Sequence, residues 1–137
     1  MLAETLADRA AIQDVMLKYA AGVDERDLEL YRSCFADDVE ILNFGSHAYH
    51  GLDTWVEYVW AALEKYNATQ HMLGPSLITI DGDSAKVRTD VQALHYLKDS
   101  DAETFTLWAT YNTLMQRSKG HWKIKRHSLQ VTGTKTE

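Results

Sequence analysis

Three side chains of this sequence could carry acid–base chemistry: Asp24 in "GVDERD", His71 in "NATQHMLGP" and His95 in "ALHYL". A neutral imidazole has a pKa of about 6.5, which suits a general base at neutral pH. A carboxylate bound to its other ring nitrogen fixes the tautomer and stabilises the imidazolium that forms. Asp24 and His71 are far apart in the chain, so only a fold that joins them can make this pair.

The first half of the chain has the apolar spacing of helices. Thr5 followed by Asp8 resembles a capping box and predicts a first helix that ends near Gly22. Asp27 can cap a short second helix, and a third helix is expected after Gly51. The segment "ADDVEILNFGS", between the second and third helices, is typical of a strand.

From Ala68 onward the apolar period changes to two, which predicts strands as far as about Thr132. The clearest strand covers Ala85 to Lys98, and its alternation places His95 on the inward face. A neighbour from Glu103 to Gln116 and a last strand follow it. Helices followed by long strands indicate an α+β fold, in which a curved mixed or antiparallel sheet wraps around about three helices. Such a cone has an interior that can hold a ligand.

Two strands depart from simple alternation. In the last strand the apolar phase changes between Ile124 and Leu129, which predicts a β-bulge near Arg126 to Ser128. The Glu103 to Gln116 strand has apolar residues on both faces. We therefore expect its outer face to be buried in a homodimer, with a homotrimer as the alternative.

Composition narrows the classes of protein. The chain has 137 residues, 45% of them hydrophobic and 25% charged, which predicts one domain over residues 1–137. Its net charge of −6 argues against nucleic-acid binding. No apolar run is long enough for a membrane span, and the N-terminus "MLAETLADRA" lacks a leader pattern, so a cytoplasmic protein is expected. Cys34 is expected to be a buried packing thiol.

Three segments resemble a known family: "LADRAAIQDVMLKYAAGVDERDLELYRSCFADDVEI", "NATQHMLGP" and "GHWKIKRHS". They are similar to the SnoaL-like branch of the nuclear-transport-factor-2-like superfamily, which includes scytalone dehydratase, hexachlorocyclohexane dehydrochlorinase and ketosteroid isomerase. The resemblance covers nearly the whole chain and implies the cone fold. It implies less about function, because this superfamily uses one pocket for several reactions and for binding.

The resemblance also implies roles for individual residues. The catalytic aspartate and two histidines of the dehydratase fall on Asp24, His71 and His95, and its serine and asparagine fall near Thr110 and Asn112. The arginine of the dehydrochlorinase falls on Arg126 or His127, depending on the bulge. Its lysine has no exact equivalent, because Tyr19 stands in its place and Lys18 is one position off. The two tyrosines that polarise the dehydratase's substrate fall on Val23 and Phe44, which cannot donate a hydrogen bond.

These residues favour a cofactor-independent lyase or isomerase that acts on a small, mostly apolar, cyclic substrate. The base would remove a proton from carbon, while His95, Thr110 and Asn112 would orient or protonate a leaving hydroxyl. Large side chains could shape the pocket: Tyr19, Phe44, Trp55, Trp60 and Met72. No metal site is expected, and the histidines of "HAYH", like His121, are expected in loops.

Each assignment has a structural alternative. His71 and His95 could be hydrogen-bonded core histidines, and Asp24 could cap the helix–turn junction. Alternation alone places Asn112 on the face opposite Phe105, and only the resemblance places it inside. The tryptophans could belong to the core. The alternative function is therefore a non-catalytic domain that binds a small ligand or mediates assembly.

Overall fold

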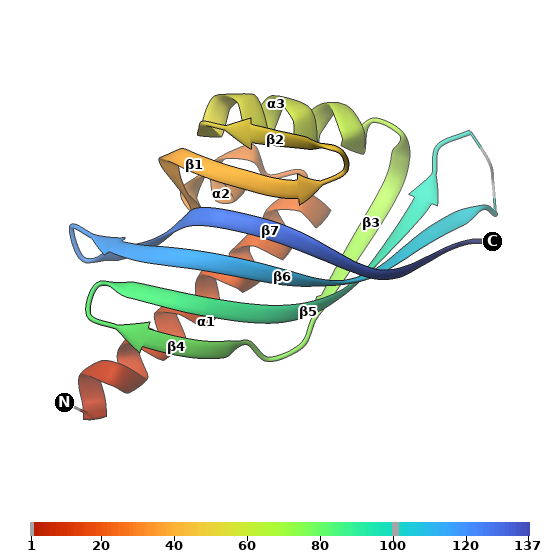
Figure 1. The fold of residues 1–137 in the computed structure, drawn as a ribbon. Helices are drawn as coiled ribbons and strands as arrows, with labels where there is room; N and C mark the ends of the chain where they lie inside the picture. Colours follow the sequence, from red (N-terminus) through yellow and green to blue (C-terminus); the bar gives the residue numbers. More distant parts are fainter. Residues whose placement is uncertain (1, 100–101) are drawn as a thin grey trace.

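The computed structural model describes residues 2–99 and 102–137 (Figure 1). Three helices precede most of the strands: α1 (Leu2–Asp24), α2 (Leu28–Ser33) and α3 (Leu52–Leu63). Seven strands form the sheet: β1 (Phe35–Phe44), β2 (His47–His50), β3 (Tyr66–Leu73), β4 (Leu77–Asp81), β5 (Ser84–Leu97), β6 (Thr104–Ser118) and β7 (His121–Thr136). None of the described helices has the length and apolarity needed to cross a membrane.

The sheet is mixed and strongly curved, and α1 runs across its concave side (Figure 1). Its strand order is β2-β1-β7-β6-β5-β3, and β4 pairs with the part of β5 that β3 leaves free. Among the described strand pairs only β1 and β7 are parallel, and α3 and three further strands separate β1 from the antiparallel β5–β6–β7 meander. The predicted α+β cone is confirmed.

Alternation along β5 places its odd-numbered residues inside the cone, from Ala85 to His95. The inward side chains of β6 and β7 pack with α1 in one hydrophobic core that contains several aromatic rings. These rings are Tyr19, Tyr31, Phe35, Trp55, Tyr111 and Trp122. The inward position predicted for His95 is therefore confirmed.

The β-bulge of the last strand lies one residue before the predicted segment. Met115 pairs with Ile124 and Leu114 pairs with Arg126, so Lys125 is the extra residue. The strand therefore changes phase at Lys125, and His127 becomes buried while Arg126 stays exposed. Of these two residues, His127 therefore faces the interior of the cone.

Two local expectations are wrong. His47 and His50 lie in strand β2, and His121 begins β7, because short hairpins extend both strands beyond the apolar pattern. Helix α1 also begins before Thr5. Asp8 therefore does not serve the expected capping box: it accepts hydrogen bonds from Arg117 at 2.7 Å and from Trp122 at 3.0 Å.

Gly22 lets α1 and α2 approach closely. A Cβ atom at this position would lie 2.8 Å from the backbone nitrogen of Tyr31, so the backbone would have to move. Gly22→Ala is expected to lower the free energy of unfolding by about 1–3 kcal/mol. Loss of stability would point to the close approach, because Ala normally stabilises a helix by about 1 kcal/mol relative to Gly. Urea unfolding measures the change in the free energy of unfolding.

Gly133→Ala is the matched control, because a Cβ atom there would meet nothing within 4 Å. It should leave the midpoint of unfolding nearly unchanged. Equal stability of Gly22→Ala and the parent protein would contradict the close approach of α1 and α2.

Candidate active site

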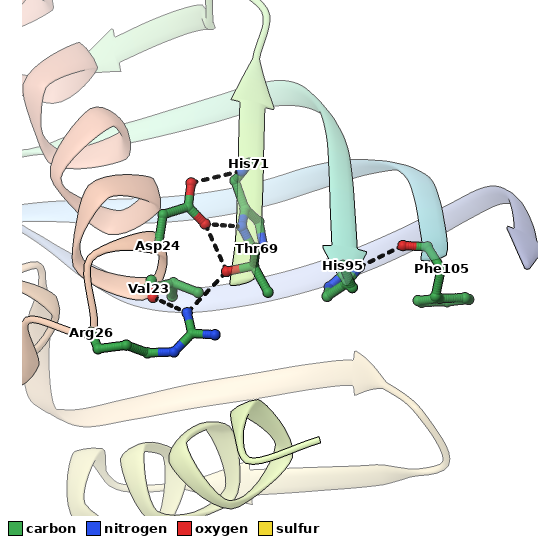
Figure 2. Close-up of polar contacts among 7 residues, drawn as sticks. All are labelled: Val23, Asp24, Arg26, Thr69, His71, His95 and Phe105. Carbon is green, nitrogen blue, oxygen red and sulfur yellow. Dashed lines mark hydrogen bonds and ion pairs between the residues drawn. The ribbon is translucent and has the colours of Figure 1, made fainter. Parts of the chain in front are cut away.

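The end of α1 meets the middle of β3 through Asp24 and His71 (Figure 2). Oδ1 of Asp24 lies 2.8 Å from Nδ1 of His71, and Oδ2 accepts the backbone N–H of His71 at 2.7 Å. The hydroxyl of Thr69, two residues earlier on the same face of β3, donates to Oδ1 at 3.0 Å. Three donors therefore hold this one carboxylate.

The directions of these hydrogen bonds place the protons. Arg26 can only donate, so its Nη1 donates to the Thr69 oxygen at 2.9 Å, and the Thr69 proton points to Asp24. Burial would raise the pKa of Asp24, but hydrogen bonds from the ring and backbone of His71 and from Thr69 outweigh it and hold that pKa below its usual value. Asp24 is thus a carboxylate at neutral pH.

Because a carboxylate only accepts, Nδ1 of His71 carries the proton between them and Nε2 has a free lone pair. Within the described part of the chain, no protein group hydrogen-bonds Nε2. The side chains of His71 and Asp24 retain 11% and 20% of their accessible surface. This pair has the geometry of a base whose tautomer is fixed.

His95 lies next to His71, with ring centroids 5.9 Å apart in an edge-on arrangement. Its Nδ1–H donates to the carbonyl of Phe105 at 3.0 Å, and burial lowers the pKa of the ring (Figure 2). His95 is therefore neutral at neutral pH, and its Nε2 is an acceptor. Tyr66 and Phe105 pack on the same ring, with centroids at 4.7 and 5.2 Å.

Several predicted pocket residues lie in the packed floor of the cone. His127 is fully buried, with Nδ1 2.8 Å from the Thr113 hydroxyl and Nε2 3.1 Å from the Tyr19 hydroxyl. Burial lowers the pKa of His127 to about 3. Trp55 donates to the Tyr31 hydroxyl at 2.9 Å. The ring of Phe44 packs on the rings of Trp55 and His127, and the ring of Trp60 packs on that of Tyr31.

Four predicted site residues lie outside the cone. The interior positions expected for Met72 and, from the resemblance, for Thr110 and Asn112 are wrong, and of the alternatives Arg126 and His127 only His127 is inside. Met72 is 63% exposed because it alternates with His71 on β3. Thr110 lies on the outer face of β6, where its hydroxyl donates to Asp90 at 2.8 Å. Asn112 and Arg126, also on the outer face, line an exposed hollow of about 430 Å³, and Arg126 lies 3.5 Å from Glu40.

The structure adds residues that the sequence reasoning missed. Thr69 shares the parity of His71, and Tyr111 and Thr113 share the inward parity of Phe105, so alternation could have found all three. Arg26 had no comparable signal, because its position depends on a backbone φ of +57° in the turn after α1. Among the side chains that the structure describes, those of residues 5–99 and 102–137, there is no group of three His, Cys, Asp or Glu placed to hold a metal ion.

A sequence model described as a SnoaL-like domain matches residues 4–128. Comparison with curated proteins gives no match. Among solved structures, a type 2 hexachlorocyclohexane dehydrochlorinase (LinA) is similar with a TM-score of 0.91 and 24% identity, over 100% of this chain and 93% of that chain.

Two further structures are similar at the same level. A candidate scytalone dehydratase from Novosphingobium aromaticivorans has a TM-score of 0.90 and 24% identity, over 98% of this chain and 91% of that one. The type 3 LinA from Novosphingobium barchaimii has a TM-score of 0.90 and 23% identity, over 100% and 94%. At these identities the three structures show a common fold.

Proposed function

The chain belongs to the SnoaL-like family, and from this premise we propose that it is a cofactor-independent lyase or isomerase. The observation that carries the proposal is the contact of 2.8 Å between Asp24 and Nδ1 of His71, which leaves Nε2 free to accept a proton. The names of similar structures, a dehydratase and dehydrochlorinases, agree with removal of a proton from carbon. The proposed substrate is a small, mostly apolar, cyclic molecule.

In the proposed reaction, Nε2 of His71 removes a proton from a carbon atom of the substrate. In an elimination, the C–H electron pair forms the new double bond while the leaving group departs from the adjacent carbon with its bonding pair. In an isomerisation, the imidazolium returns the proton to another carbon. Asp24 stabilises the imidazolium in both cases, because the carboxylate stays bound to Nδ1–H.

His95 cannot act as a general acid for a leaving group at neutral pH. Its Nδ1–H is held by the Phe105 carbonyl, so a neutral His95 offers an acceptor at Nε2 and no proton for a leaving group. Thr110 and Asn112 are on the outer face and cannot help. The proposed roles are therefore orientation of a substrate hydroxyl by His95 and return of the proton by the His71 imidazolium.

The proposal is tested by exchange of substrate protons in deuterated water. A base that removes a proton from carbon should exchange the α-hydrogens of a cyclic ketone, even when no group leaves, and proton NMR follows this loss. Cyclic hydroxy-ketones, vicinal diols and halogenated rings then test elimination. No exchange and no turnover across this panel would contradict the proposed function.

Asp24→Asn is expected to reduce turnover by about 10²-fold or more with little loss of stability. An amide can donate to Nδ1 of His71 and so favours the tautomer that places the proton on Nε2, where the base is needed. Initial rates and thermal melting measure the two effects. Asp27→Asn is the matched control, because its side chain only caps α2 at Leu30.

A binding domain without catalysis is the second candidate. It is favoured by Val23 and Phe44, which stand where the dehydratase has two hydrogen-bonding tyrosines and which pack in the core of this chain. Ligand binding without turnover in wild type, and equal binding by Asp24→Asn, would select this candidate.

We also propose that the chain forms a homodimer through the outer face of the sheet. Large side chains on this face are exposed, among them Trp108 and Tyr96. Burial of such surface is the usual reason for apolar residues on both faces of a strand. Light scattering that gives the mass of a monomer at micromolar concentration would contradict the dimer.

A further inference from the structure

Arg26 carries a buried nitrogen that the protein does not use. Its Nη1 donates to the carbonyl of Val23 at 2.5 Å and to the hydroxyl of Thr69 at 2.9 Å. Among the side-chain nitrogen and oxygen atoms of the described residues, its Nη2 is the one that is buried and has no hydrogen-bond partner. Buried donors of native proteins are nearly always paired, so this exception requires an explanation.

The charge of Arg26 is also unmatched. Its two partners are a neutral carbonyl and a neutral hydroxyl, and it forms no ion pair with a carboxylate in the described part of the chain. Asp24 is occupied by Thr69 and His71 instead. A guanidinium is always charged, and a buried charge is normally paired with an opposite one.

The backbone holds the guanidinium in this place. Arg26 has a φ of +57°, which is uncommon for a residue other than glycine, and the two contacts of Nη1 fix one end of the planar group. Figure 2 shows that end against Val23 and Thr69, while Nη2 extends away from both. The free nitrogen is therefore fixed in position rather than carried on a loose side chain.

We propose that Nη2 of Arg26 binds an anionic oxygen of the ligand once the side chains that cover it in this structure move aside, so that the site takes small ring compounds with a carboxylate or similar oxyanion. Hydrogen bonds from a guanidinium to an oxyanion are among the strongest in proteins. This inference deepens the proposed function, on which it rests, by naming the class of ligand that the same site takes.

One hydrogen-bond chain joins Arg26 to His71: Nη1 of Arg26 donates to Thr69, Thr69 donates to Asp24, and Asp24 accepts from Nδ1 of His71. Each end of the chain keeps one nitrogen outside it, Nη2 of Arg26 and Nε2 of His71. The rings of Tyr66 and Phe105 pack on His95, whose ring lies 5.9 Å from that of His71, and they offer an apolar surface to the ring of a ligand bound at His71.

Calorimetric binding of benzoate and benzamide tests the proposal, because these probes share a shape and differ in charge. The measurements use His71→Gln protein, in which turnover cannot interfere. Benzoate should bind more tightly than benzamide. Adding Arg26→Asn should raise the benzoate Kd about tenfold or more and change the benzamide Kd less than about twofold. Asn is chosen because it tolerates positive φ.

Arg26→Lys keeps the charge without the planar group and should have an intermediate benzoate Kd, which keeps the test informative if Arg26→Asn does not fold. An equal loss of both probes would mean that Arg26 only shapes the turn. That result would overturn the inference. So would a benzoate Kd that Arg26→Asn leaves unchanged, or a lack of benzoate binding before Arg26 is changed. Failure of the proposed function looks different: benzoate binds through Arg26, but wild type neither exchanges nor converts any compound.

Discussion

His71→Gln is expected to lower turnover, or the rate of proton exchange from carbon, by about 10²- to 10⁴-fold. The loss follows from removal of Nε2, the free lone pair that the Asp24 contact leaves on the ring. The fold should survive, because Asp24 still accepts the backbone N–H of residue 71 and the Thr69 hydroxyl. Initial rates under saturating substrate, together with thermal melting, measure both quantities.

His121→Gln is the matched control, because it makes the same exchange at an exposed histidine at the start of β7. Its turnover and melting temperature should stay close to those of the parent protein. A structural His71 would give the opposite pattern, in which His71→Gln lowers the melting temperature and leaves the rate per folded molecule unchanged.

Acid is expected to destabilise the protein well above the pH at which carboxylates titrate, and His127 is the main reason. Burial lowers its pKa from 6.5 to about 3, so the folded state keeps it neutral while the unfolded chain protonates it below pH 6.5. The stabilisation is complete above pH 6.5 and is lost as the pH falls toward 3. Between pH 6.5 and pH 4 the loss should be about 3 kcal/mol.

His127→Gln removes this contribution, because an amide can still bond to Thr113 or Tyr19 and does not titrate. Urea unfolding at pH 7 and pH 4 should show a smaller difference for this variant than for the parent protein. His121→Gln should keep the full difference. The assignment fails if His127→Gln retains the parent's dependence on pH.

Local patterns determined much of the fold. The change of period at Ala68 predicts that the helices lie before it and the long strands of the sheet's meander after it, and both are found, because the spacing of apolar residues reflects the geometry of each element. Alternation also placed His95 inside and Asn112 outside the cone. The interior position that the resemblance implied for Asn112 is wrong, although the same resemblance identified the family.

The tertiary structure alone decided the composition of the candidate site. Asp24 meets His71 because α1 packs across the sheet so that its last residue reaches β3, a contact that no local pattern contains. The extra residue at Lys125 decides that His127 is buried and Arg126 is exposed, because one inserted residue exchanges the two faces of a strand. Arg26 depends on one positive φ angle in a turn, and neighbouring elements rather than residue type hold it there.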